Sequence, residues 1–381
     1  MEEKGCNREE AISFLAGLRA EDVHPNQILS SMCTIPHPIA VAVHEMFSAT
    51  NLGDPGLFPG TLKVEELLIR SIGELMHLAS AGGYSTSGGT ESNLQAIRIA
   101  KKLKPEVEQP NIVVPESVHF SFDKTCDMLG LAMRTVPYGK NYTVDAEKMA
   151  ERIDKNTIAV VAVAGTTEYG MVDDVPAVAE IACESGCFCH VDAAFGGFVI
   201  PFLPDPAPFD FAVPGVDSIS LDPHKMGLAT IPCGCLLLRD PDVVSCLNVD
   251  TPYLTVKKQY TLAGTRPGAD VAGAYAVIKH LGREGFRSMV AGCMENTRKL
   301  VAGMEACGFI RVVNPIMNVA AFTGGNAPAG WTVSHTRAGH LRIVVMPHVT
   351  RDVIEAFLAD AASHSTIHKA ASSSINYTIR R

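Results

Sequence analysis

Short hydrophobic runs rich in β-branched residues alternate along the chain with longer segments in which apolar residues recur every three or four positions. The short runs predict buried strands, and the longer segments predict amphipathic helices. We expect strands at residues 111–114, 132–136, 157–164, 187–191, 216–221 and 235–238. Because parallel strands pair through crossover helices, the pattern predicts an α/β fold with a mostly parallel sheet and helices on both faces.

The chain before and after this alternation has a different pattern. We expect helices at residues 9–19, 38–49, 61–78 and 91–103, with a Gly- and Pro-rich loop at 51–60 and a glycine-rich turn before residue 91. Towards the carboxyl end we expect a long helix from Gly268 toward Gly303 with breaks at Gly282 and Gly292, strands at 310–313, 318–322 and 341–345, a helix at 351–362 and a frayed tail from His364. These elements predict an amino-terminal arm (1–60), a large domain (61–290) and a small carboxyl-terminal domain (291–381).

Composition narrows the class of protein. The 381 residues are 47% hydrophobic and only 19% charged, against about 25% charged in typical domains, which hints at surface buried between subunits. The formal net charge is −9 without any long Lys/Arg cluster, so we expect no nucleic-acid partner. The apolar runs are shorter than the roughly 18 residues of a membrane span, and the first residues do not resemble a targeting peptide, so we expect a soluble, cytoplasmic protein without a membrane partner.

The eleven cysteines are scattered, which suits thiols kept reduced in the cytoplasm. The spacing of Cys187 and Cys189, and of Cys233 and Cys235, is compatible with pairs of zinc ligands. Both pairs lie in apolar strand-like runs, however, where alternation puts the two thiols on one face as small buried side chains. We therefore expect no metal site.

Residues 87–93, Ser-Gly-Gly-Thr-Glu-Ser-Asn, open a predicted helix. The glycines let a ligand approach the backbone closely, Thr90 or Ser92 can cap the helix, and the free amides of the first turn form the positive end of its dipole. These features are typical of a phosphate site. An ordinary capped helix explains the same residues, and the motif alone does not decide between the two.

Two strand ends carry the other candidate groups. Asp192 closes an apolar strand at the edge where open α/β sheets place ligands. A carboxylate buried there needs a cation, such as a protonated heterocyclic nitrogen, or the amides of a neighbouring helix. Lys225 lies in the turn after the next predicted strand, and we expect its neighbours Pro223, Met226 and Leu228 to depress the pKa of the amine and make it nucleophilic toward a carbonyl.

In this order, the phosphate loop, the acidic strand end and the lysine turn resemble those of pyridoxal-phosphate enzymes of the aspartate-aminotransferase fold, specifically the group II amino-acid decarboxylases. The likeness spans nearly the whole chain and includes residues 31–33, 51–58, 88–91, 119–122, 164–168, 190–197, 222–227, 264–266 and 341–348. It is weakest at residues 323–339 and ends near residue 359. The resemblance implies pyridoxal 5'-phosphate as cofactor and fold type I, with a seven-stranded-type sheet in the large domain and a small α+β domain.

The resemblance also implies roles for single residues. Lys225 would form the Schiff base with the cofactor, and Asp192 would pair with the pyridinium nitrogen so that the ring can accept electrons. Gly89 and Thr90 would hold the phosphate, and Thr265 is the candidate to complete that site from a second subunit.

Further side chains would surround the cofactor ring. His119 would stack on one face, and the methyl of Ala194 would pack on the other. His224 is expected to contact the phosphate or relay protons. Thr167 is expected to hydrogen-bond near the cofactor, and its neighbour Thr166 is an equally good candidate from the sequence.

Four residues are implied to act on the substrate. Arg342, flanked by apolar residues that suggest burial, would bind a substrate carboxylate. Tyr253 lies in a polar loop and would be the general acid, although a loop tyrosine without chemistry is an equally good interpretation. Asn51 and Asp54 would line the substrate pocket from the arm, although turn formation alone explains Asp54.

The resemblance implies an enzyme that decarboxylates a small-molecule amino acid, either L-tyrosine to tyramine, L-aspartate to β-alanine, or both, and so supplies precursors of methanofuran and coenzyme A. We expect a homodimer whose active sites are shared between subunits. The alternatives are an L-glutamate decarboxylase, a carbon–carbon lyase of the sphingosine-phosphate lyase type, and a non-catalytic scaffold that keeps only the fold.

Overall fold

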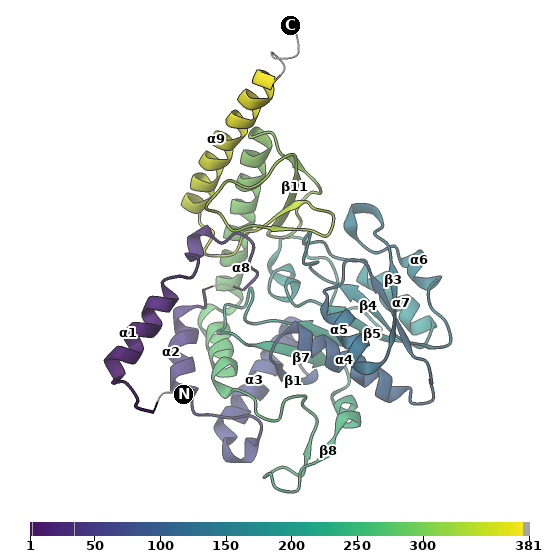
Figure 1. Ribbon diagram of the computed structural model, residues 1–381. Helices are drawn as coiled ribbons and strands as arrows, with labels where there is room; N and C mark the ends of the chain where they lie inside the picture. Colours follow the sequence, from purple (N-terminus) through teal and green to yellow (C-terminus); the bar gives the residue numbers. More distant parts are fainter. Residues whose placement is uncertain (2, 34, 376–381) are drawn as a thin grey trace.

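A computed structural model describes residues 1, 3–33 and 35–375, with side chains up to residue 363. Its centre is a seven-stranded sheet with the strand order β1-β7-β6-β5-β4-β2-β3 (Figure 1). The strands are β1 Gly82–Thr86, β2 Asn111–Pro115, β3 Ala132–Val136, β4 Thr157–Val163, β5 Phe188–Asp192, β6 Ser218–Leu221 and β7 Gly234–Leu238. Strands β3, β2, β4, β5 and β6 run parallel, so the predicted α/β fold with a mostly parallel sheet is confirmed.

Strand alternation divides the core of this sheet between its two faces. In β4, Val160 and Ala162 belong to one hydrophobic cluster, while Ala159, Val161 and Val163 belong to the other. Helices cover both faces, as predicted, because neither apolar face can be left in water. The helices of this region are α3 Pro59–Leu75, α4 Gly89–Leu103, α5 Ser121–Leu129, α6 Ala146–Ala150 and α7 Val175–Glu184.

The sheet departs from the sequence prediction at one edge. The segment predicted to be only a glycine-rich turn contains strand β1, which pairs antiparallel with β7, and β7 is also antiparallel to β6. Two glycines at the start of a five-residue strand hide its alternation, and pairing with β7 supplies what local propensity lacks.

The remaining elements flank this domain. Helices α1 (Arg8–Arg19) and α2 (Pro38–Phe47) precede it, and the 39-residue α8 (Gly268–Ala306) leads from it to a second, antiparallel sheet with the order β10-β11-β13-β12 (Figure 1). That sheet contains β10 Ile310–Arg311, β11 Val319–Thr323, β12 Ser334–His335 and β13 Leu341–Val344, and α9 Arg351–Ile375 follows it. A two-stranded hairpin is formed by β8 Val249–Asp250 and β9 Lys258–Gln259, and short 3-10 turns lie at Pro25–Gln27, Pro55–Leu57, Lys140–Tyr142, Gly196–Phe198, Ile200–Phe202 and Pro241–Leu247.

Helix α8 bends where the sequence predicted one of its two breaks. Gly282 has φ 57° and ψ −174°, which are not helical angles, whereas the helix continues through Gly292. The break predicted at Gly292 is therefore wrong, because one glycine in a long packed helix lowers helix propensity without ending the helix. The prediction of a frayed tail from His364 is also wrong up to Ile375, since an Ala-rich segment can extend the helix before it; residues 376–381 lie outside the described part.

The thiols of Cys187, Cys189, Cys233 and Cys235 are buried in or beside strands, as the apolar pattern predicted. Among the described residues no group of His, Cys, Asp or Glu side chains has the arrangement of a metal site. No helix in this described part is long and apolar enough to cross a membrane. The division into an arm and two domains stays a prediction.

The kink in α8 leads to a testable difference between two glycines. We expect Gly282→Ala to lower the free energy of unfolding by about 1–3 kcal/mol, because its backbone angles are open almost only to glycine. Gly292→Ala is the matched control: it lies in regular helix with open space around its Cβ position and should raise stability by about 0.5–1 kcal/mol. Urea unfolding of both variants measures the effect, and a destabilising Gly292→Ala or a neutral Gly282→Ala would contradict this account.

Candidate active site

A cavity of about 350 Å³ opens at the carboxyl ends of the parallel strands. The parallel register sets Val163, Asp192 and Ser220 side by side at the ends of β4, β5 and β6. Loops that follow these strands and β1 and β2 supply the rest of the wall. Eight of the residues singled out in the sequence line this one cavity: Gly89, Thr90, His119, Thr167, Asp192, Ala194, His224 and Lys225.

The loop between β1 and α4 forms a cradle of backbone atoms at one end of the cavity. Gly88 has φ 146°, and no side chain caps the first turn of α4. A methyl group on Gly89 would lie 3.0 Å from the Cβ atom of Ala194, and one on Gly88 would lie 3.0 Å from Cε1 of His224. Only glycine leaves room here for a ligand to meet the helix amides, so the loop suits an anion such as a phosphate.

Asp192 is held in the cavity wall by neutral donors. Its Oδ1 accepts from the backbone N–H of Ala194 (3.1 Å) and the hydroxyl of Ser220 (3.3 Å), and its Oδ2 accepts from Nδ2 of Asn93 (2.9 Å). None of these donors cancels the negative charge. The carboxylate is therefore oriented but left free to pair with a cationic group of a ligand.

Asn93 lines the cavity, but the sequence interpretation gave it no role of its own. Its amide lies between Asp192 and His190, whose Nε2 is 2.9 Å from Oδ1 of Asn93 and whose Nδ1 is 2.8 Å from the hydroxyl of Ser218. Burial lowers the pKa of His190 to about 4, so the imidazole is neutral and passes no positive charge to Asp192. The sequence did contain a signal for this position: Asn93 follows Thr90 by three residues on a predicted helix, and this spacing places both side chains on the same helix face.

Lys225 lies in the cavity wall beside a second carboxylate. Its Nζ is 3.1 Å from Oδ2 of Asp222. Burial alone would lower the pKa of Lys225, but the charges of Asp222 and Asp192 outweigh it, and the pKa is raised. The expectation of a depressed amine pKa is therefore wrong: the apolar neighbours in sequence are real, but acidic side chains from two strand ends decide the balance.

His119 reaches the cavity from the segment after β2. Its Nδ1 accepts a hydrogen bond from the backbone N–H of Ser121 (3.2 Å) at the start of α5, and its ring centroid is 3.9 Å from that of Phe120. Burial lowers the pKa of His119, although the charge of Asp192 opposes this, so the ring is favoured in its neutral form. A neutral flat ring on the cavity wall can stack on a planar ligand.

Arg342 approaches the same cavity from β13 of the second sheet. It is buried, as expected, and its guanidinium donates to the carbonyl of Thr167 (2.5 Å), the carbonyl of Ser30 (3.0 Å) and the hydroxyl of Ser334 (2.8 Å). Burial lowers the pKa of Arg342 to about 10, opposed by the charge of Glu168. A positive group aimed by neutral acceptors is suited to an anionic ligand.

Five candidate residues do not line the cavity of their own chain: Arg342, which only binds the backbone carbonyl of the lining residue Thr167, and four residues outside the wall. Tyr253, in the loop between β8 and β9, is 86% exposed, and Thr265 is also exposed. Asp54 binds the backbone N–H and hydroxyl of Thr255 in that same hairpin. Asn51 accepts hydrogen bonds from the backbone N–H groups of Gly53 and Arg266. Within one chain, Asn51 and Asp54 therefore order loops instead of lining the cavity.

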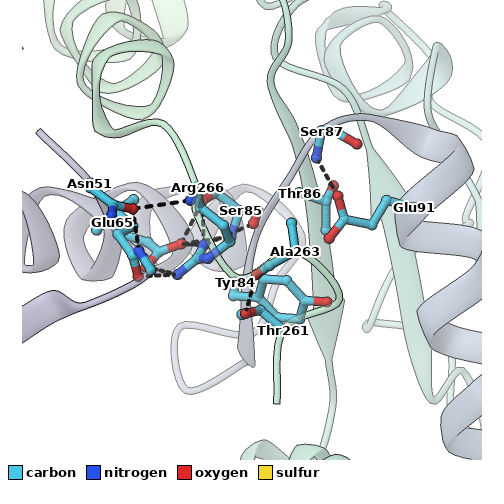
Figure 2. A network of polar contacts seen from close by, with 12 residues as sticks. Asn51, Glu65, Tyr84, Ser85, Thr86, Ser87, Glu91, Thr261, Ala263 and Arg266 are labelled. Carbon is cyan, nitrogen blue, oxygen red and sulfur yellow. Dashed lines mark hydrogen bonds and ion pairs between the residues drawn. The ribbon is translucent and has the colours of Figure 1, made fainter. Parts of the chain in front are cut away.

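Arg266 anchors the segment that carries Thr265 (Figure 2). Its NH1 is 2.6 Å from Oε1 of Glu65 on α3 and 3.0 Å from the hydroxyl of Ser85 on β1, and its guanidinium lies 5.4 Å from the Tyr84 ring centroid. Burial opposes ionisation of Glu65, but Arg266 and Ser85 outweigh it and hold the carboxyl pKa below its usual value. Two residues beyond Ser85, the N–H of Ser87 donates to Glu91, so the same strand connects this ion pair to the glycine cradle.

We expect Arg266→Met to lower the free energy of unfolding by about 3–5 kcal/mol, because it leaves the buried Glu65 carboxylate without its cation. Arg70→Met is the control on α3: Arg70 forms an ion pair of 3.1 Å with Glu74, but both side chains are largely exposed, so the loss should stay below about 1 kcal/mol. Chemical unfolding compares the two, and equal losses would show that the Arg266 pair is not a special contact. The double variant Glu65→Gln with Arg266→Met should recover part of the stability.

Comparisons with known proteins agree with this geometry. Residues 49–322 match the model of the pyridoxal-dependent decarboxylase conserved domain. A probable L-tyrosine/L-aspartate decarboxylase of Methanocorpusculum labreanum is 76% identical over 95% of this chain and 99% of its own length. A probable L-aspartate decarboxylase of Archaeoglobus fulgidus is 48% identical over 92% of this chain and 97% of its own length.

Solved structures share the fold. A sphingosine-1-phosphate lyase of Burkholderia pseudomallei superposes with a TM-score of 0.88 at 25% identity, covering 100% of this chain and 95% of the other. A glutamate decarboxylase of Lactobacillus brevis superposes with a TM-score of 0.86 at 22% identity, covering 96% of this chain and 94% of the other. With the family model matched over most of its length, the chain belongs to the pyridoxal-dependent decarboxylase family.

Proposed function

We propose that this enzyme removes the α-carboxyl group of L-tyrosine, L-aspartate or both, releasing carbon dioxide and tyramine or β-alanine. The observation that carries the proposal is that a lysine, an uncompensated aspartate and an anion cradle line one cavity, beside a buried arginine. The substrates follow from the names of relatives that are 48–76% identical over more than nine-tenths of the chain.

The residues of the cavity fit pyridoxal 5'-phosphate. The space that a side chain at Gly88 or Gly89 would fill suits the phosphate, the charge of Asp192 suits a protonated ring nitrogen, and the amine of Lys225 suits a carbonyl carbon. When bound, the cofactor supplies a ring system that accepts the electron pair of the bond broken at the substrate Cα.

The chain's own residues decide which bond is broken. In this proposal Arg342 holds a substrate carboxylate. The imidazole ring of His119 and the methyl of Ala194 would lie on opposite faces of the cofactor ring and so fix its plane. Thr167, whose carbonyl binds Arg342, couples that guanidinium to the cavity wall, and His224 contributes at the phosphate end. Asp192 keeps a proton on the ring nitrogen, because its charge stabilises the protonated form.

We further propose a homodimer in which Thr265 and Tyr253 act in the partner's cavity, Thr265 at the phosphate and Tyr253 as general acid. Both are exposed in their own chain, on segments braced by Asn51, Asp54 and Arg266. Helix α1 adds support, because it has no buried residue and exposes apolar side chains such as Phe14 and Leu15. We also propose a cytoplasmic location and a role in supplying methanofuran and coenzyme A precursors. The scattered positions of the cysteines fit a reducing compartment.

Incubation with a pool of amino acids, followed by mass spectrometry of the amines, tests the substrate. We expect tyramine, β-alanine or both, and Lys225→Ala should lose the visible absorbance of the covalently bound cofactor and at least about a thousandfold of the rate of carbon dioxide release. Release at the normal rate by Lys225→Ala would refute the proposed role of the lysine. Glutamate as the sole substrate would move the assignment to a glutamate decarboxylase.

A carbon–carbon lyase is the second candidate, because the lyase of Burkholderia pseudomallei shares the fold at a TM-score of 0.88. The same assay includes a phosphorylated amino alcohol. Aldehyde formation from that compound without turnover of any free amino acid would replace the decarboxylase proposal. Cofactor binding without any turnover would favour a non-catalytic scaffold.

Subunit mixing tests the shared site. Lys225→Ala and Thr265→Arg should each be inactive alone, and a mixture allowed to exchange subunits should regain about a quarter of the normal activity, because half of the dimers are hybrids with one intact site. No recovery, with exchange shown by mass spectrometry, would place Thr265 in its own chain's site. A fully active monomer in dilute solution would refute the dimer.

A further inference from the structure

Asp222 is a second carboxylate in the cavity, in addition to Asp192. It directly follows β6 and is 1% exposed, and its Oδ1 is buried without any hydrogen-bond partner in the described structure. Its Oδ2 faces Nζ of Lys225 at 3.1 Å. A carboxylate in this position is costly unless a cation or a proton compensates it.

The surroundings leave Lys225 as the nearest cation to Asp222. Nε2 of His224 is farther away, at 3.8 Å, while its Nδ1 is occupied by the backbone carbonyl and N–H of Cys233. The other titratable groups that act on Lys225 are Asp192 and the thiol of Cys33 from the arm segment. Asp192 already accepts three hydrogen bonds, whereas Asp222 contacts the amine through Oδ2 and its Oδ1 accepts no hydrogen bond in the described structure.

Asp222 also adjoins the glycine cradle. A methyl group on Gly89 would lie 3.2 Å from its Oδ2, and one on Gly88 would lie 4.0 Å away. The carboxylate therefore stands between the reactive amine and the site that suits a phosphate. The Asp222 carboxylate is compensated while the Lys225 amine is protonated, and it loses this compensation when the amine gives up its proton to react.

We infer that Asp222 is a catalytic acid–base group that shares one proton with Lys225, taking it from the amine before the amine attacks the cofactor and returning it afterwards. The pair is ammonium with carboxylate at rest and amine with carboxylic acid when reactive, so its net charge stays zero in both states. This avoids a bare buried charge at either residue.

The transfer balances. An N–H bond of the ammonium breaks, an O–H bond forms on Oδ2, and the freed lone pair of Nζ attacks the carbonyl carbon of pyridoxal 5'-phosphate. The two protons left on nitrogen depart with the carbonyl oxygen as water. The proton on Asp222 then returns to the nitrogen of the new C=N bond, and no oxidant or reductant is needed.

The first test measures Lys225 in the cofactor-free full-length protein. Amines are labelled with trace acetic anhydride across a pH range, and peptide mass spectrometry gives the pH midpoint for Lys225, with exposed Lys63 as internal reference. We expect Asp222→Asn to lower the pH midpoint of Lys225 labelling by at least about one unit. Asp210→Asn, which removes a buried carboxylate that binds His77 outside the cavity, should leave it unchanged.

The second test measures the rate at which the cofactor-free protein condenses with pyridoxal 5'-phosphate. A pair that shares one proton has a constant fraction of free amine, so the wild-type rate should change by less than about threefold between pH 6 and 8. Relative to wild type, the Asp222→Asn rate should fall about tenfold for each pH unit below the lysine midpoint, because only solvent can take the proton.

The outcomes separate the proposal from a structural role. An unchanged midpoint of Lys225 labelling in Asp222→Asn overturns the proposal. A shifted midpoint also overturns it if the condensation rates of Asp222→Asn and wild type depend on pH in the same way, because Asp222 would then act on Lys225 only through its charge. If Asp222→Asn does not fold, Asp222→Ser takes its place. The wild type alone also decides, because a wild-type condensation rate that rises tenfold per unit from pH 6 to 8 is incompatible with a shared proton.

Discussion

The parallel pairing of β4, β5 and β6 is the constraint on which the rest of the site depends. Each strand ends at the same edge of the sheet, so Val163, Asp192 and Ser220, which lie at or next to these ends, stand side by side. Residues nearly a hundred positions apart along the chain, such as Asn93 and Asp192, meet there through a hydrogen bond of 2.9 Å. Burial on both faces keeps the register, because a one-residue slip would turn hydrophobic side chains out of the two core clusters.

The electrostatics of the cavity follow from what compensates each charge. Asp192 is oriented by neutral donors and keeps its charge for a ligand, whereas Asp222 is compensated by Lys225. The two side chains are the same chemical group, but their neighbours differ: Asp192 is surrounded by neutral donors, and Asp222 contacts the Lys225 amine. Arg342 is the counterpart with positive charge: its hydrogen-bond acceptors are neutral carbonyls and a hydroxyl, and the charge of Glu168 only partly offsets the effect of burial on its pKa.

A second group of contacts supports the site from outside. The buried pair of Arg266 and Glu65 joins the segment before α8 to α3 and β1. The segment before α8 also carries Thr265, whose side chain is exposed. The hairpin of β8 and β9 is tied to the arm through Asp54 and Thr255. Polar residues that resemble cavity residues in the sequence, such as Asp54, therefore brace loops within one chain.

Several features of this protein were determined by the sequence alone, because they are local. Hydrophobic periodicity predicted the parallel strands and their alternation with helices, and the glycine at position 282 predicted the bend in α8. Motif chemistry predicted Gly89, Thr90, Asp192 and Lys225, since glycine loops, strand ends and turns are recognisable within a few residues. The family resemblance implied the other four of the eight residues that line one cavity. The strand β1 was missed, because its stability comes from antiparallel pairing with β7, more than a hundred residues away.

Other features were decided only by the tertiary structure. The sign of the pKa shift of Lys225 depends on carboxylates from two strands, and apolar neighbours in sequence predicted the opposite sign. The role of Asn93 and the pairing of Arg266 with Glu65 likewise need the fold, because partners 97 and 201 positions away complete them. Local sequence determines which groups a segment can offer, whereas charge and hydrogen bonding are set by distance in space, and only the folded chain fixes those distances.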